Sequence, residues 1–194
     1  MLGLANDVSG GSRRQVLDAA RQVFAVRAYD EVTVADVAVV AGVSVSGIYE
    51  HFVNKRELYL ANLQEWGEQL IQQTRPADGD PLGPLVRYSL SVFLDFVEDN
   101  PVLFKAVTLG GPGVDEVAHE IPRRVERRFI RRILDQVGVT RPSPQIRVEM
   151  AGWMAFVRGS AVRWLDFPGL SKDELLGMQV RHLMNALRMG GASG

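Results

Sequence analysis

Apolar residues recur along most of the chain at intervals of three and four residues, the spacing that gathers them on one face of an α-helix. Several of these runs begin at a serine, threonine or asparagine, side chains that cap the first turn of a helix; these residues are Ser12, Thr33, Ser44, Asn54, Ser143 and Ser171. No internal repeat and no strand-like alternation competes with this pattern. The sequence therefore predicts an all-α fold.

Residues 33–52 predict two short helices joined by a tight turn. Thr33 and Asp36, three residues apart, form a capping signature for the first helix. Gly42 follows the apolar face of that helix, and glycine can adopt the positive φ that a sharp turn requires. Ser44 then caps the second helix. This layout can place a helix in the DNA major groove, but a helix, a glycine turn and a helix also occur in ordinary helical bundles.

The second helix has a single apolar side, formed by Ile48 and Phe52, and small, polar and aromatic groups elsewhere. Such a face suits contact with base-pair edges. An earlier helix opened by Ser12 supplies the third element of a small trihelical core. Asn54 caps the helix that follows, where Lys55 and the helix N-terminus are predicted to clamp a phosphate. The alternative for Lys55 is a solvated surface charge.

The run from Ser12 to Leu58 resembles the N-terminal DNA-binding domain of the TetR family of bacterial transcriptional regulators. Order, spacing and residue type agree at Val16, Ala19, Ala20, Phe24, Thr33, Ala38, Ala41, Gly42, Val43, Ser44, Ile48, Tyr49, His51, Phe52, Lys55 and Leu58. The resemblance implies a ligand-responsive homodimer, usually a repressor, whose remaining helices bind an effector and dimerise. The predicted DNA-binding residues are Arg13, Thr33, Ser44, Val45, Ser46, Gly47, Tyr49, His51 and Lys55.

Two positions depart from the family pattern. Glu50 stands where members often have a polar or basic group, and Gly47 stands where threonine, serine or alanine is common. Residues 1–60 carry six lysines and arginines against seven acids, so this part of the chain has no bulk positive field. DNA binding must therefore depend on where a few positive groups lie, and we expect Arg13, Arg14 and Lys55 to carry it.

The chain divides into three predicted parts: a disordered tail over residues 1–11, a three-helix helix-turn-helix DNA-binding domain over residues 12–56, and a larger helical effector-binding and dimerisation domain over residues 57–190. Within the last part, residues 75–84 predict a break before a helix capped by Asp80 and Pro81, and Asn100 and Pro101 predict a stop and restart. Further helices are expected over about 114–137, interrupted early by Pro122, over 143–166, and from 171 onward.

The last two predicted helices carry strips suited to association. Small residues line one helix at Gly152, Ala155, Gly159 and Val162, and apolar residues line the other at Leu176, Val180, Leu183 and Leu187. Two chains could pair both strips in a four-helix interface, which predicts a homodimer. The alternative is that these faces pack within one chain.

Aromatic and methionine side chains form adaptable apolar cavities. The predicted effector pocket comprises Phe93, Phe96, Phe104, Met150, Trp153, Met154 and Arg158, with Phe156 as a further candidate. Arg158 and His119 could orient a polar end of the ligand. The alternative is that most of these side chains are plain core, and that the histidine and arginine are satisfied structural groups.

Six arginines, Arg123, Arg124, Arg127, Arg128, Arg131 and Arg132, recur at helical spacing in the segment before Val137. A second nucleic-acid patch is one interpretation of this run. We favour a solvated helix face that pairs with neighbouring acids such as Glu120, Glu126 and Asp135.

The 194-residue chain has a net charge of −1 and no cysteine, which excludes disulfides and thiolate metal sites. It has no signal-peptide pattern and no apolar run long enough to span a bilayer, so we expect a cytoplasmic protein without membrane partners. Three separated histidines and the absence of catalytic motifs argue against an enzyme or a bound cofactor. The predicted function is a transcriptional repressor that binds double-stranded DNA as a dimer and is released by a small apolar effector. The alternative is a small-molecule binding protein without sequence-specific DNA binding.

Overall fold

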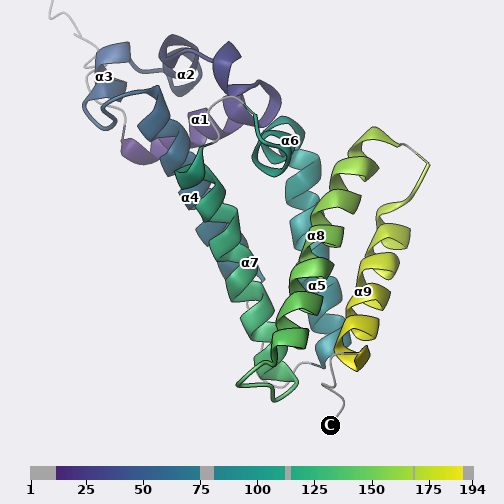
Figure 1. The fold of residues 1–194 in the computed structure, drawn as a ribbon. Coiled ribbons are helices and arrows are strands. Elements are labelled where there is room, and N and C mark those ends of the chain that lie inside the picture. Colours follow the sequence, from purple (N-terminus) through teal and green to yellow (C-terminus); the bar gives the residue numbers. More distant parts are fainter. Residues whose placement is uncertain (1–11, 75–80, 112–114, 168, 190–194) are drawn as a thin grey trace, which may run out of the picture.

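The computed structural model describes residues 12–74, 81–111, 115–167 and 169–189, which form helices and no strands. The predicted tail over residues 1–11 lies outside the described residues. A small helical module forms one end of the molecule, and long helices extend from it (Figure 1). No helix in the described part of the chain combines the length and apolar character needed to cross a membrane.

The small module consists of three helices and a short 3-10 turn. These are α1 (Arg13–Val26), the turn η1 (Tyr29–Glu31), α2 (Val34–Ala41) and α3 (Val45–Tyr49). Ser12, Thr33 and Ser44 each accept a hydrogen bond from the backbone amide three residues later, at 3.2, 3.1 and 3.0 Å. The predicted N-caps are therefore confirmed, and they set where each helix of the module begins.

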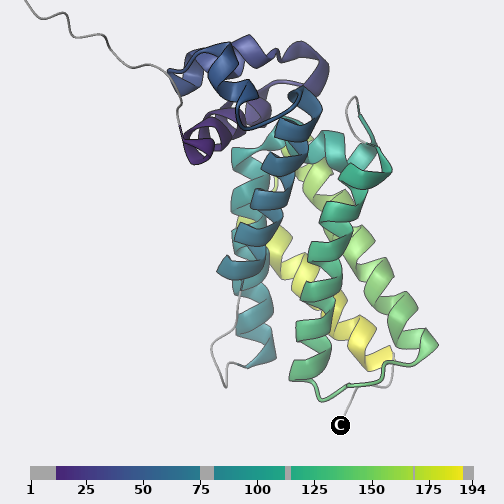
Figure 2. The ribbon, with the colours of Figure 1, turned by 90° about the vertical axis from the view of Figure 1, so that its left-hand side faces the viewer.

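The long helices lie side by side beneath the module (Figure 2). They are α4 (Lys55–Gln73), α5 (Leu82–Asp99), α7 (Glu116–Gln136), α8 (Pro144–Asp166) and α9 (Lys172–Met189), with the shorter α6 (Pro101–Leu109) between α5 and α7. Pro81 stands just before α5, whereas Asp80, the other predicted cap, lies outside the described residues. The predicted caps Asn54, Ser143 and Ser171 are confirmed.

The helix α7 passes through Pro122 without a break, so the predicted interruption is wrong. Proline removes one backbone hydrogen bond and crowds the preceding turn, a local cost that tertiary packing can offset. Here Ala118 and Ile121, in the turn before Pro122, are both buried against the small module. Asp115 caps the helix by accepting a bond from the amide of Ala118.

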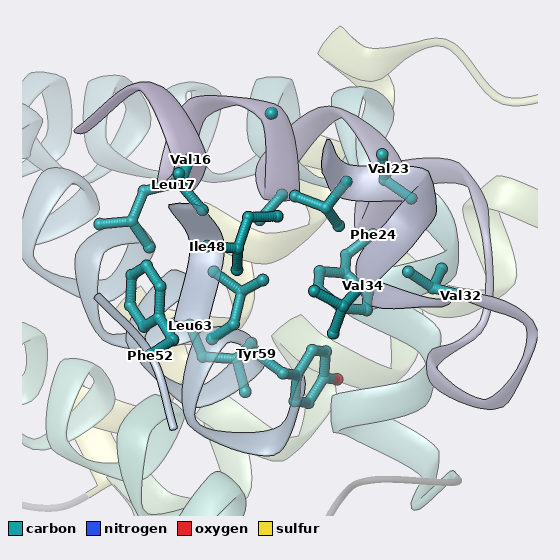
Figure 3. Packing of buried hydrophobic residues seen from close by; sticks show 14 of the residues in the cluster. Val16, Leu17, Val23, Phe24, Val32, Val34, Ile48, Phe52, Tyr59 and Leu63 are labelled. Carbon is teal, nitrogen blue, oxygen red and sulfur yellow. The ribbon is translucent and has the colours of Figure 1, made fainter. Parts of the chain in front are cut away.

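Two hydrophobic clusters hold the fold together. The first lies between the small module and the first half of α4, and Phe24, Ile48, Phe52 and Tyr59 belong to it (Figure 3). Tyr59 is 1% exposed, and burial raises its pKa to about 12. The second cluster lies between α5, α7, α8 and α9.

The first cluster does not stop at the module boundary. Leu103 and Val107 of α6 and Ala118 and Ile121 of α7 belong to it, and Phe96 of α5 packs against both clusters. The small module therefore rests on α6 and α7 through continuous apolar contact.

We expect Gly42→Ala to lower the free energy of unfolding by about 1–2 kcal/mol, because its φ of 66° lies in the left-handed region that penalises a Cβ. No atom lies within 4 Å of an added Cβ, so the cost comes from the backbone alone. Urea unfolding measures the difference. The control is Gly83→Ala inside α5, where alanine favours the helix and stability should hold or rise. Equal effects of the two substitutions would contradict this explanation.

Candidate functional site

The turn between α2 and α3 sets the direction of α3. Gly42 adopts φ 66° and donates its amide to the carbonyls of Ala38 and Val39, which closes α2. Gln15 of α1 donates to the carbonyl of Ala41 at 2.7 Å and ties the end of α2 to the first helix. These local bonds hold α3 at a defined angle on the surface of the module.

One side of α3 is buried and the other faces solvent. Ile48 is 1% exposed and Phe52, just after the helix, is 2% exposed, both in the first hydrophobic cluster. Val45 is 39% and Tyr49 50% exposed, and Ser46 is exposed as well. The described face therefore offers an apolar group, a phenol and a hydroxyl, groups that can contact thymine methyls and base edges.

Two predicted DNA-binding residues, Gly47 and Thr33, make contacts within the small module itself. Gly47 is buried and donates its amide to Ser44, so it belongs to the packed side of α3 and not to the exposed face. The Thr33 hydroxyl accepts from the amide of Asp36 and donates to its carboxylate at 2.8 Å. Bonds from the amide and hydroxyl of Thr33 hold the pKa of Asp36 below its ordinary value.

Lys55 points into the module. Its ammonium donates to the carbonyls of Tyr29 and Val32 at 2.8 and 3.0 Å, and it lies 4.1 Å from the centre of the Tyr29 ring. The sequence suggested a phosphate clamp or a solvated charge. The structure instead uses Lys55 to tie the 3-10 turn to the start of α4.

The other predicted cations differ in their surroundings. Arg13 is exposed, with its guanidinium 5.1 Å from the centre of the Phe52 ring, next to the end of α3. Arg14 pairs with Asp18 and Glu65, and the bond to Asp18 is the main reason that its pKa is raised. His51 is half-buried. Arg13 is therefore the predicted cation best placed to reach a phosphate beside α3.

A cavity of about 280 Å³ lies between α4, α5, α6, α7 and α8. Five of the predicted pocket residues line it, namely Phe93, Phe96, Phe104, Met154 and Arg158, together with His119. Apolar side chains from α4 complete the wall, and these were not predicted: Leu63, Trp66, Leu70 and Ile71. The Trp66 and Phe96 rings lie against each other at a tilt of 32°, with centroids 4.1 Å apart.

Met150 and Trp153 do not line the cavity, which corrects the prediction for both. They are 1% and 3% exposed in the second hydrophobic cluster, and the Trp153 indole donates to the carbonyl of Gln179 at 2.9 Å. Phe156 lies against the ring of His182, also away from the cavity. Met150 and Trp153 are therefore core side chains, whereas Phe156 is half-buried beside the exposed His182 of α9.

The arginines of α7 are partly paired, as the sequence analysis favoured. Arg127 pairs with Glu120, while Arg124 and Arg128 both pair with Glu68 of α4. Two outcomes differ from the expectation. Arg123, Arg128 and Arg132 line the cavity. Arg132 also donates to the carbonyls of Thr74 and Ile71 at 3.0 and 2.9 Å, which fastens α7 to the end of α4.

Only part of the predicted dimer strips is free on the described surface. Gly152, Ala155 and Gly159 of α8 are exposed, and an added Cβ at either glycine would meet nothing within 4 Å. Val162, Leu176, Leu183 and Leu187 are instead buried in the second cluster of the same chain, and Val180 is half-buried against it. The apolar strip of α9 therefore packs into the core of its own chain.

Two family models match the chain. One describes bacterial regulatory proteins of the tetR family and matches residues 16–61, and the other describes a tetracyclin repressor-like C-terminal domain and matches residues 82–186. The two matches divide the chain into the small module and most of the long helices.

Solved structures with a similar fold cover nearly all of the chain. A tetR-family transcriptional regulator from Streptomyces coelicolor has a TM-score of 0.85 at 25% identity, with 100% of this chain and 85% of that chain covered. A transcriptional regulator from Rhodococcus has a TM-score of 0.73 at 20% identity, with 92% and 97% covered. FadR from Bacillus subtilis, solved in complex with stearoyl-CoA, has a TM-score of 0.68 at 18% identity, with 90% and 97% covered.

We expect Lys55→Ala to lower the free energy of unfolding by about 1.5–3 kcal/mol, because it removes charge-assisted bonds to two backbone carbonyls of the module. The control is Lys172→Ala, since Lys172 pairs with the surface acids Asp95 and Glu98 and such pairs contribute about 0–1 kcal/mol. Urea unfolding measures both. A loss at Lys55 no larger than that at Lys172 would show that its internal bonds contribute little.

Proposed function

Since this chain belongs to the TetR family of bacterial regulatory proteins, we infer that it is a repressor that binds a palindromic operator as a homodimer and releases it when a small apolar effector binds. Its role as a DNA-binding transcriptional regulator, and not an enzyme, follows from the family. The mode of regulation, the operator symmetry and the effector response are the proposal. A regulator that binds the bacterial chromosome acts in the cytoplasm, so we propose that location for this protein.

The observation that carries the effector response is a set of shared residues. Leu63 of α4 and Leu103 and Val107 of α6 line the cavity and also belong to the hydrophobic cluster of the small module. A ligand that filled the cavity would press on side chains that support α1 and α3. Because protein interiors are close-packed, such a displacement reaches the module instead of being absorbed.

The exposed face of α3 supports the DNA-binding part of the proposal. We assign base-edge contacts to Val45, Ser46 and Tyr49, and a phosphate contact to Arg13. Ser44 and Thr33 act mainly as caps that fix where their helices begin. Lys55 contributes by holding the module together, so a phosphate at the start of α4 would meet backbone amides before it met the lysine.

Dimerisation explains how a module with so few positive groups can bind DNA. The exposed strip of Gly152, Ala155 and Gly159 continues to Val148, which is 72% exposed. Small side chains allow two copies of α8 to approach closely. A two-fold axis there would bring this strip against the same strip of a second chain. Two modules on one operator would supply the affinity that one module lacks.

The apolar lining supports an effector with an apolar body. One neighbour of similar fold, FadR, was solved with stearoyl-CoA, a molecule with a long apolar chain. In this chain the phenylalanines of α5 and α6 and the leucines of α4 form the matching wall. The alternative, a binding protein without operator affinity, would show ligand binding but no preference for any duplex.

We expect Tyr49→Ala to weaken operator binding by about tenfold or more, since a base-edge contact contributes about 1–3 kcal/mol of discrimination. Fluorescence anisotropy measures affinity for duplex DNA from the region upstream of the protein's own gene, at two salt concentrations. The control is Tyr88→Ala on α5, because Tyr88 is 56% exposed and lies outside the small module. Unchanged affinity for Tyr49→Ala alone would remove α3 from the interface, and wild-type protein that bound all duplexes alike would contradict operator recognition.

We expect light scattering at micromolar concentration to give twice the 21.4 kDa chain mass for the wild type and a single chain mass for Gly152→Arg. An arginine at this exposed site has room within its own subunit but would separate two facing copies of α8. Gln64→Arg, on the exposed side of α4, is the control and should remain dimeric. A wild-type monomer would refute the dimer, and a dimeric Gly152→Arg would place the interface elsewhere.

A further inference from the structure

The polar groups around the cavity are strongly biased toward hydrogen-bond donors. His119, Arg123, Arg128, Arg132 and Arg158 line it against a single carboxylate, that of Glu126. Glu126 already accepts a charged bond from Arg158, which takes up part of its acceptor capacity. The carbonyls of Ile71 and Thr74 are likewise engaged by Arg132. The arginines of the wall therefore already engage several of its acceptors, and donors remain in excess.

Two further donors of the wall lack a partner. Trp66 and Ser89 both line the cavity, and the indole nitrogen and the hydroxyl oxygen are buried without a hydrogen-bond partner among the described residues. Ser89 is 2% exposed. A buried donor without an acceptor carries a desolvation cost that a bound group could relieve. An indole N–H can only donate, so the missing group at Trp66 must accept.

From this bias we propose that the effector is a small carboxylic acid with an apolar body, bound with its carboxylate on Arg158. The inference rests on the proposed function, since it names the chemical class of that effector. A guanidinium holds a carboxylate through parallel N–H bonds, and Arg158 uses one of its terminal nitrogens for Glu126. The apolar body lies against Phe93, Phe96 and Phe104.

The size of the cavity limits the acid. A volume of about 280 Å³ is near the lower end of the roughly 300–1,000 Å³ range of clefts that hold drug-sized ligands. A medium-chain or aromatic acid fits this space. A cation is disfavoured, because Glu126 is already neutralised and the remaining charges are positive.

The Arg158–Glu126 pair allows a test in which substitutions of the two partners change acid affinity in opposite directions. The two side chains are 35% and 18% exposed, and the pair joins α8 to α7. A ligand carboxylate would compete with Glu126 for Arg158. Removing the arginine charge should therefore weaken an acid, whereas removing the Glu126 charge should tighten it. A pair with only a structural role would not discriminate between charged and neutral ligands.

The experiment is isothermal titration of the full-length protein, without DNA, with decanoate, decan-1-ol and decylammonium, and with 1-naphthaleneacetate as an aromatic acid. We expect one or both acids to bind. If the pocket prefers an alkyl body to an aromatic one, decanoate should bind more tightly than decan-1-ol and decylammonium. Arg158→Gln should weaken the bound acid by about 10-fold to 100-fold. Glu126→Gln should tighten it, and neither variant should change decan-1-ol binding by a comparable factor.

The matched control is Arg127→Gln, because Arg127 lies on α7, pairs with Glu120 and does not line the cavity. It should leave acid binding unchanged. Arg158→Lys retains the charge and should recover part of the affinity, which separates a charge effect from a folding defect. Thermal unfolding of each variant confirms that it is folded.

Each result decides the proposal. Failure of both acids to bind, a preference for decylammonium or decan-1-ol over the acids, or equal weakening by Arg158→Gln and Arg127→Gln would overturn it. If the wild type did not bind an operator, the proposed function would be overturned, but the titration result would still hold. Acid binding that left operator affinity unchanged would show an acid site that is not the inducer site, which would overturn the assignment of the effector.

Discussion

The helix α4 packs both into the core of the small module and into the wall of the cavity, and the arrangement of these two parts depends on that packing. Its first half supplies Leu58, Tyr59 and Leu63 to the core beneath α3. Its second half supplies Trp66 and Leu70 to the cavity wall. Leu63 belongs to both environments. The 19-residue helix thus connects the packing beneath α3 directly to the cavity wall.

Contacts beyond α4 reinforce this coupling. Leu103 and Val107 of α6 also touch both the module core and the cavity. Arg56, at the start of α4, pairs with Asp115, the N-cap of α7, and this pair lowers the pKa of Asp115. Arg132 then joins α7 to the last turn of α4. The two helices are thus fastened at both ends, with the cavity wall between the fastenings.

Sequence was sufficient for features that depend on neighbouring residues. Thr33, Ser44 and Asn54 cap helices with side chains only three residues from the amides they satisfy, so their positions could be predicted directly. The positive φ at Gly42 is equally local. The buried side of α3 followed from helical spacing, because Ile48 and Phe52 are separated by four residues.

Features that depend on distant partners could not be predicted in this way. Periodicity marks Trp153 and Phe104 alike as inward-facing, but it does not tell whether the space in front of a side chain is filled. Leu183 and Leu187 form an apolar strip whichever chain covers them, and here their own chain does. Lys55 finds its carbonyl partners 23 and 26 residues away, in a turn whose path the sequence pattern did not reveal.

The internal engagement of Lys55 bears on how DNA affinity depends on ionic strength. Each protein cation that neutralises a phosphate releases counterions from the duplex, and the number released sets how steeply affinity falls as salt rises. A lysine whose ammonium is bound by carbonyls of its own chain adds little to that number. The affinity of the proposed operator complex would therefore fall less steeply with rising salt than if this lysine also met a phosphate.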